Sequence, residues 1–155
     1  MSLLEACIAR FKYLRMLDLS NSSFEVLPSS IGSLKHLRYL DLSDNCIIKQ
    51  LLDSICELHS LQTLLLLGCS NLERLPKGIR DIINLRLLWV TTKHTCLSKK
   101  AIGCLDSLRF LWIICCENLE CLFEGMEEGR LTNLVRIFFS TFSTQIRTTN
   151  NLQIS

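Results

Sequence analysis

The sequence predicts an α/β solenoid: a horseshoe-shaped arc of about five to six repeats, with a parallel sheet on the concave side and short helical or irregular segments on the convex side. Two linked patterns predict this fold. The apolar frame L-x-x-L-x-L begins at residues 14, 37, 61, 85, 108 and 134, with Val, Ile or Phe at some later positions. Repeats of about 20 to 29 residues stack because one repeat alone cannot bury its apolar face. The second frame, I-x-x-L-x-x-L, ends on the first leucine of the next repeat and begins at Ile31, Ile55, Ile79 (with Ile82 as its second member) and Ile102.

The first three repeats are the most regular. Strands are expected at residues 16–19, 39–42 and 63–66, where alternate leucines of each frame point into the core. Pro28 and Pro76 follow the next apolar stretch in two of these repeats, where a residue without an N–H ends extended structure. The segments that follow are predicted to form one or two helical turns on the convex side, at residues 29–34, 53–58 and 77–82.

Residues 1–13 are predicted to be the back half of a further repeat. Ile8, Phe11 and Leu14 reproduce the second frame, but no strand precedes them in this sequence. Terminal repeats need a polar cap for solubility, and none is recognisable here. The chain is therefore expected to be part of a larger protein.

The pattern weakens toward the other end of the chain. The fourth repeat becomes polar after Val90, and the fifth carries an acidic insertion at residues 124–129 that we expect to form a surface loop. No frame continues beyond Phe139. The repeat domain is thus expected to span residues 1–139, followed by a Ser/Thr-rich, disordered tail at residues 140–155.

Composition excludes several classes of function. The net charge is +2 and the basic residues are scattered, which argues against a dedicated nucleic-acid surface. Hydrophobic residues make up 48% of the chain, yet no apolar run approaches the roughly 18 residues of a membrane span. The first residues lack the basic head and apolar core of a signal peptide. A cytoplasmic protein without a membrane span is expected.

The nine cysteines do not have the pattern of a disulfide framework or a zinc site. Their number is odd and no C-x-x-C occurs. Cys69 and Cys116 occupy the repeat position at which Asn45 stands in the second repeat. A thiol or an amide there can donate to neighbouring turn carbonyls, so we expect a structural role and a reducing compartment.

No catalytic constellation is found. Phosphate-loop, H-E-x-x-H, G-x-S-x-G and dinucleotide-binding motifs are absent from the sequence. His36, His59 and His94 are expected on the surface. Asp18 and Asp41 share one repeat position and would lie side by side on the sheet, but exposed structural carboxylates are the favoured interpretation over a catalytic pair. We expect no enzyme activity, no cofactor and no metal.

The concave face is the favoured site for binding a protein. Residues at the centre of each strand should face outward and change from acidic to aromatic along the arc, and exposed apolar patches mark interfaces. Two alternatives stay open: further repeats or another domain cover this face, or the fourth and fifth strands are shifted by one residue and turn both tryptophans inward. The candidate residues are Asp18, Tyr39, Asp41, Leu65, Trp89, Phe110, Trp112 and Phe138.

Three segments carry a family resemblance: LRMLDLSNSSFEVLPSSIGSLKHLRYLDLSDN, LGCSNLERLPKGIRDIINLRLLW and LRFLWIICCENLECL. They resemble the repeat region of plant intracellular nucleotide-binding leucine-rich-repeat disease-resistance receptors. The G-C-x-x-L-x-x-L-P form at residues 68–76 is the most family-specific piece. The resemblance implies a leucine-rich-repeat fold and a role in defence, with a pathogen effector, a host protein that effectors modify, or the receptor's own nucleotide-binding domain as the partner.

A second family remains open. Cytosolic leucine-rich-repeat scaffolds that bind small GTPases or phosphatases share the L-P-x-x-I-x-x-L frame of this sequence. Extracellular plant repeat receptors form a further family, with G-x-I-P in each repeat and a signal peptide. Neither feature occurs in this sequence. The nucleotide-binding module of the receptors is also not in this sequence, so no residue is assigned to ADP or ATP.

Overall fold

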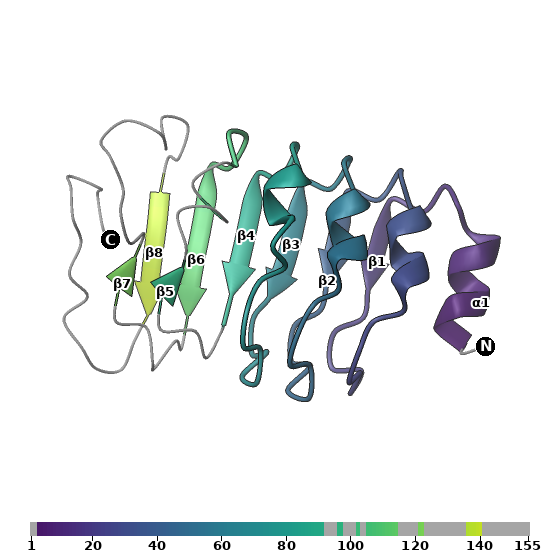
Figure 1. Cartoon of the computed structure of the whole chain (residues 1–155), viewed down its shortest axis with the longest axis horizontal. Coiled ribbons are helices and arrows are strands. Elements are labelled where there is room, and N and C mark those ends of the chain that lie inside the picture. The colour runs from purple at the N-terminus through teal and green to yellow at the C-terminus, as the bar shows by residue number, and fades with distance from the viewer. Residues whose placement is uncertain are drawn as a thin grey trace.

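The computed structural model describes residues 3–91, 96–97, 102, 105–114, 121–122 and 136–140. It confirms the predicted solenoid (Figure 1). Six parallel strands form one sheet in the order β1-β2-β3-β4-β6-β8. Their bounds are β1 Met16–Asp18, β2 Tyr39–Asp41, β3 Thr63–Leu66, β4 Leu87–Val90, β6 Phe110–Ile114 and β8 Arg136–Ser140. A small second sheet pairs β5, Cys96–Leu97, with β7, Cys121–Leu122.

The register of the large sheet follows the leucine frame in every pair of strands. The inward position runs through Leu17, Leu40, Leu64, Leu88 and Leu111, and the register partner of Leu111 on β8 is Ile137. Leu88 and Leu111 are fully buried, as are the next inward residues, Val90 and Ile113. A shift of the fourth or fifth strand by one residue is therefore excluded, because it would place these side chains on the outer face.

The convex side carries helical turns where the sequence predicts them (Figure 1). Each of the three 3-10 helices follows an extended residue or a turn and ends with a backbone N–H bonded to the carbonyl three residues earlier. Gly32 brings two of them together, since a Cβ at this position would lie 2.6 Å from the Ser54 carbonyl oxygen. The helices are α1 Leu3–Arg10, η1 Ser29–Ser33, η2 Asp53–Glu57 and η3 Ile79–Asp81.

One continuous apolar core fills the space between the sheet and the helical turns. The second frame supplies its convex half: Ile31, Ile55 and Ile79 are buried against the leucines of the strands. Burial of one such side chain contributes about 1.5–3 kcal/mol relative to its exposure to water. Stacking of repeats, not the stability of any single turn, therefore holds the coil together.

The N-terminal segment departs from the prediction in one respect. Ile8 on α1 is buried and Leu14 packs against the core, as the second frame requires. Phe11, predicted to be the middle member of that frame, is 52% exposed. The chain leaves α1 at Arg10, and the Arg10 guanidinium lies 5.9 Å from the Phe11 ring, so this ring packs at the surface beneath a cation.

Turns after the strands use one repeated backbone conformation. Asn21, Asp44 and Gly68 stand at the same position of three successive repeats, and all have a positive φ, of 51°, 59° and 70°. Asn, Asp and Gly are the residues that adopt this left-handed conformation most readily. In the second and third repeats the next residue turns inward, since Asn45 and Cys69 are fully buried, whereas Ser22 in the first repeat is exposed.

Some predictions concern residues outside the described part of the chain. These are the acidic insertion at 124–129, the tail beyond residue 140, His94 and Cys116. Among the residues that the structure describes, no helix has the length and apolar character needed to cross a membrane.

Candidate interaction surface

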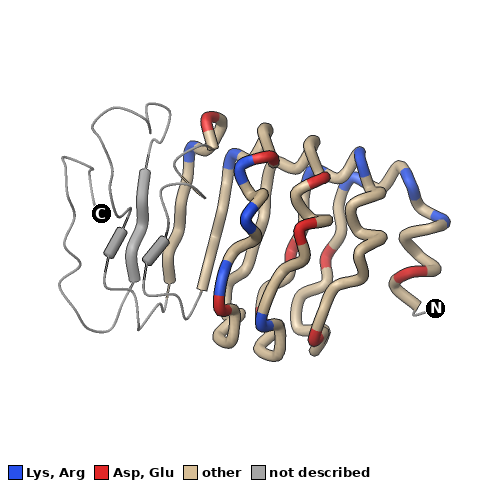
Figure 2. Tube along the Cα trace, viewed as in Figure 1, with Lys and Arg blue, Asp and Glu red and all other residues tan. Residues whose placement is uncertain are grey.

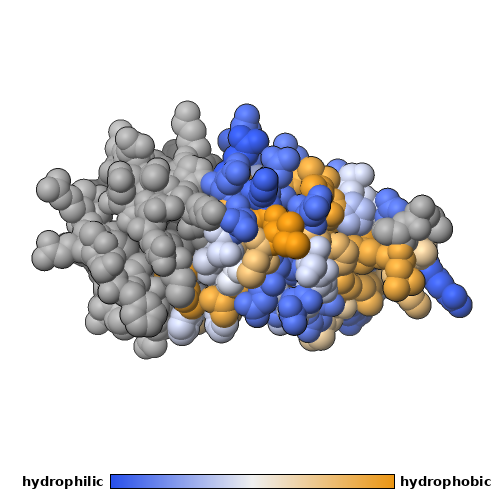
Figure 3. Space-filling model, turned by 90° about the horizontal axis from the view of Figure 1, so that it is seen from below, coloured by the Kyte–Doolittle hydropathy of each residue, from blue (hydrophilic) through white to orange (hydrophobic). Residues whose placement is uncertain are grey.

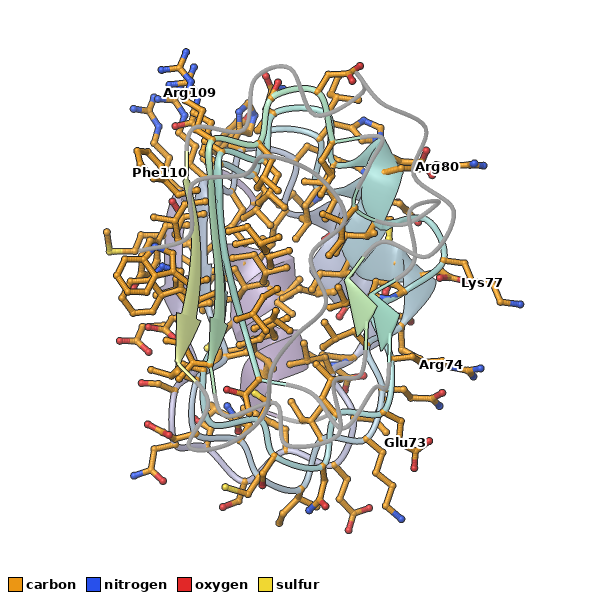
Figure 4. The ribbon with its side chains drawn as sticks, turned by 90° about the vertical axis from the view of Figure 1, so that its left-hand side faces the viewer. Glu73, Arg74, Lys77, Arg80, Arg109 and Phe110 are labelled. Carbon is orange, nitrogen blue, oxygen red and sulfur yellow. The ribbon has the colours of Figure 1, made fainter. Side chains whose placement is uncertain are left out.

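The outward residues at the centre of each strand form one continuous row across the concave face. Strand pairing places Asp18 beside Asp41, Asp41 beside Leu65, and Leu65 beside Trp89. The row then continues to Trp112, whose register partner on β8 is Phe138; the side chain of Phe138 lies outside the described part of the structure. All of the helical turns lie on the other side of the sheet (Figure 4). Five of the sequence-predicted candidates are thus register partners in one row: Asp18, Asp41, Leu65, Trp89 and Trp112. We call the apolar part of this row, Leu65, Trp89 and Trp112, the aromatic stripe.

The two tryptophans pack against each other within the aromatic stripe. Their ring centroids are 5.1 Å apart and the planes are tilted by 40°. Aromatic pairs of this geometry contribute about 0.5–1.5 kcal/mol beyond the area they bury. Both side chains are partly exposed, but the Trp89 Nε1 atom is buried and has no acceptor among the described residues. A buried N–H without an acceptor carries a desolvation cost of about 1–3 kcal/mol.

The acidic end of the row is held by hydrogen bonds within the chain. Asp18 Oδ1 accepts a hydrogen bond from the Ser20 backbone N–H at 2.9 Å, and Asp41 Oδ1 accepts one from the Ser43 N–H at 2.8 Å. The Ser20 N–H is the main cause that lowers the pKa of Asp18. Tyr39 donates its hydroxyl to Asp41 Oδ2 at 3.0 Å. Burial, followed by this hydrogen bond, raises the pKa of Tyr39.

These interactions favour the structural interpretation of the two aspartates. They are register partners, as predicted, but each carboxylate binds the backbone of its own repeat. The lowered pKa of Asp18 makes its carboxyl group a poor general acid near neutral pH. The two carboxylates therefore hold their turns in place, and they do not form a pair that shares a proton.

Sequence reasoning missed a row of arginines at the edge of this face. Arg15, Arg38, Arg86 and Arg109 each stand one residue before a strand, and all four are exposed. Lys and Arg segments recur along this upper edge of the arc (Figure 2). Arg109 projects outward directly above Phe110 (Figure 4). The signal was present in the sequence, because an arginine follows the first leucine of the frame in four repeats. We call these four residues the arginine rim.

The opposite side of the coil differs in its charge pattern. Glu73, Arg74, Lys77 and Arg80 project from the convex side of the third repeat (Figure 4). Charges of both signs alternate there, and two exposed ion pairs form, Lys35–Glu57 at 2.8 Å and Arg80–Asp81 at 3.8 Å. A shallow pocket of about 210 Å³ lies between the second and third repeats and is lined by residues 50–53 and 74–77. Seen from below, the edge formed by the turns also mixes hydrophilic and hydrophobic side chains (Figure 3).

The remaining candidates for chemistry are dispersed. His36 lies on the surface with its ring centroid 5.2 Å from that of Tyr13, and His59 is exposed. In the described part of the chain, no three His, Cys, Asp or Glu residues converge as metal ligands. Four cysteines in this part are free thiols: Cys7 and Cys46 at the surface, Cys56 and Cys69 in the core.

A parallel sheet facing outward, with helical turns behind it and repeated leucine frames between them, defines a leucine-rich-repeat solenoid. Residues 2–153 match the family model described as a leucine-rich repeat region, so the chain belongs to this family. Proteins with this fold typically act as non-catalytic scaffolds that bind other proteins.

One solved structure supports the fold, and two others show a weaker similarity. The chain is similar to a leucine-rich-repeat protein of Leptospira interrogans, with 31% identity and a TM-score of 0.67 over 90% of this chain and 36% of that one. An internalin of Listeria monocytogenes gives 16% identity and a TM-score of 0.36, covering 91% of this chain and 58% of that one. Internalin C2 of the same organism gives 17% identity and a TM-score of 0.33, covering 86% and 84%. The chain thus spans little more than a third of the Leptospira protein. A search of curated proteins gives no match.

Proposed function

We propose that the chain is a non-catalytic module that binds a partner protein through its concave face. The aromatic stripe supports this proposal, because three consecutive strands present Leu65, Trp89 and Trp112 outward in register. The inward residues of the same strands already fill the core, so the stripe is not needed to bury the repeats. Tryptophan is enriched among the residues that dominate binding energy at interfaces.

The more specific proposal is a plant disease-resistance receptor. The chain would be its recognition and autoregulatory repeat region in the cytoplasm, and the partner a pathogen effector, a host protein that effectors modify, or the receptor's own nucleotide-binding domain. The G-C-x-x-L-x-x-L-P form at residues 68–76 supports it. Gly68 in this form supplies a positive φ, and Cys69 donates to the Leu42 carbonyl. The motif therefore has a physical role in the turn between repeats.

The second candidate is a cytosolic scaffold for small-GTPase or phosphatase signalling. The L-P-x-x-I-x-x-L frame at residues 27–34 supports it, since this frame builds the entry to η1. The coding sequence upstream of Met1 distinguishes the two candidates. A phosphate-loop module in the same reading frame favours the receptor, and a protein-coding segment without one favours the scaffold.

Accessibility of the tryptophans tests the binding face directly. The single-tryptophan variants Trp89→Phe and Trp112→Phe each report on the remaining indole. In both variants we expect acrylamide to quench the emission of the folded chain, more weakly than after unfolding in urea, because both rings are partly exposed. Two indoles that are fully protected in the folded monomer would contradict a concave binding face. Near-ultraviolet circular dichroism controls for changes in folding.

A further inference from the structure

The arginine rim has a defined geometry, set by the backbone at the start of the sheet. The N–H groups of Arg38 and Tyr39 both donate to the Arg15 carbonyl, at 2.8 and 3.1 Å. The N–H groups of Arg109 and Phe110 likewise bind the Arg86 carbonyl, at 2.9 and 3.0 Å. Adjacent strands lie about 4.8 Å apart. The rim thus consists of two pairs of neighbouring arginines, which Gln62 separates at the same repeat position.

These arginines form no ion pair with a carboxylate among the described residues. Asp18 and Asp41 lie three residues after Arg15 and Arg38, but both bind backbone N–H groups at the far end of their strands. Arginine stays ionised at every physiological pH. Like charges on neighbouring chain segments repel each other. The described part of the chain therefore carries a row of positive charge that an external anion would neutralise.

The arginine rim borders the outward face of the sheet at four repeats, and Arg86 and Arg109 are the two members that stand on the strands of Trp89 and Trp112. Tyr39 follows Arg38 and Phe110 follows Arg109, and the outward positions two residues further on are Asp41 and Trp112. A segment that lies across the strands would touch guanidinium groups with one edge and aromatic rings with the other. It must therefore present carboxylates on one side and apolar side chains on the opposite side, which alternation in an extended chain achieves.

We propose that the concave face binds an extended, acidic segment of a partner protein, with its carboxylates on the arginine rim and its apolar side chains on the aromatic stripe. This inference rests on the proposed protein-binding function and specifies the partner's chemistry. Guanidinium groups bind carboxylates through paired, charge-assisted hydrogen bonds. Asp18 and Asp41 lie at the other end of this face. They would therefore repel a phosphate backbone that runs along all four repeats, but not a short segment seated beside Arg86 and Arg109.

The test uses a short fluorescein-labelled peptide of alternating glutamate and leucine, with a glutamine–leucine peptide as its uncharged counterpart. Fluorescence anisotropy measures binding to the full chain. We expect the glutamate peptide to bind at least about tenfold more tightly, and its affinity to fall as the salt concentration rises. The double variant Arg86→Gln/Arg109→Gln should weaken binding of the glutamate peptide about tenfold or more, because each charge-assisted hydrogen bond contributes substantially to affinity.

A matched control removes the same charge from the other side of the coil. Arg74→Gln/Lys77→Gln alters two exposed cations of the convex side and should leave the affinity within about twofold, since these residues lie far from the concave face. Unfolding in urea should show that both double variants are folded. Equal weakening by both variants would overturn the proposal, because it would reflect net charge alone.

Two further outcomes separate this inference from the proposed function. Loss of peptide binding in Trp112→Ala, with no effect of the rim variant, would retain a concave binding face and refute the acidic partner. If neither peptide binds, the acidic partner is refuted as well. Accessible tryptophans in the quenching experiment would then still support a binding site on the concave face. A single-stranded oligothymidylate that binds more tightly than the glutamate peptide, and loses affinity in the rim variant, would identify a nucleic-acid surface instead.

Discussion

Asn45 and Cys69 donate to the same acceptor, the buried carbonyl oxygen of Leu42. Asn45 Nδ2 lies 2.9 Å from this oxygen and Cys69 Sγ lies 3.1 Å from it. The two side chains occupy the same position of successive repeats, and both are fully buried. Asn45 makes the corresponding bond to the preceding repeat through the Leu19 carbonyl, at 2.8 Å. A polar ladder thus joins the first three repeats at the end of the sheet.

Replacement of Asn45 by alanine should remove the strongest part of this ladder. The amide also accepts from the backbone N–H groups of Ser22 and Phe24, at 3.2 and 3.4 Å. Buried backbone groups that lose a partner cost about 1–3 kcal/mol each, so Asn45→Ala should lower the free energy of unfolding by about 2–4 kcal/mol. Urea denaturation measures the change. Asn84→Ala is the matched control: it removes one exposed bond, to the His59 carbonyl, and should cost less than about 1 kcal/mol. Equal losses would contradict the ladder.

The thiol of Cys69 should make stability depend on pH in the alkaline range. Burial raises the pKa of this thiol to about 11, whereas a thiol in an unfolded chain has a pKa of about 8.5. Between these values the unfolded chain loses the proton and the folded chain keeps it, so the free energy of unfolding falls as pH rises. Below about pH 8.5 both states are protonated and the contribution is constant. Cys69→Ser keeps a donor for the Leu42 carbonyl and should show a shallower alkaline decline in urea midpoints.

Thiol labelling checks the burial on which this pH dependence rests. Burial also raises the pKa of Cys56 to about 12. Cys7 and Cys46 are exposed, so a maleimide should modify them in the folded chain, and Cys56 and Cys69 only after unfolding. Mass spectrometry of peptides locates each modification. Rapid labelling of Cys69 under native conditions would show that the ladder is open.

The turn at Gly68 should tolerate a side chain only after a second change. Its φ of 70° disfavours any residue with a Cβ, and a Cβ there would clash with the Asp44 carboxylate. Gly68→Ala should therefore destabilise the chain by about 1–3 kcal/mol. Asp44→Gly removes the clashing carboxylate at a position whose own φ of 59° suits glycine. The double variant should then lose less stability than the two single variants together, and strict additivity in a double-mutant cycle would argue against the clash.

The strands and their register could be predicted from the sequence because leucine spacing records which side chains face inward. A frame of three leucines leaves one register that buries all of them, and Leu40, Leu64 and Leu88 are register partners as expected. The spacing of the repeats likewise predicted that Asn45 and Cys69 occupy one equivalent, buried position. Such inferences succeed where burial of apolar groups is the dominant free-energy term.

Surface features were harder to predict, for a related reason. Exposed positions are not constrained by packing, so the leucine frames alone did not reveal that Arg86 and Arg109 form part of a rim. The exposure of Phe11 depends on which elements pack over it, which its spacing from Ile8 does not record. The tilt between the rings of Trp89 and Trp112 could not be predicted either. The register determines which strand positions are neighbours, but side-chain rotation determines how the rings are oriented.

Adjacent leucines of β3 provide a strict test of which face is the core. Leu64 is fully buried, so Leu64→Ala should lower the free energy of unfolding by about 2–5 kcal/mol and loosen the neighbouring repeats, whose stability depends on their interfaces. Leu65 follows it on the outward face and is only partly buried, so Leu65→Ala should cost about 1 kcal/mol or less. Urea denaturation followed by circular dichroism measures both, and a smaller m-value for Leu64→Ala would indicate that neighbouring repeats unravel first. An unchanged transition in Leu64→Ala, or equal losses in the two variants, would contradict the observed register. The two substitutions remove the same atoms, so a difference between them reports only on the side of the sheet.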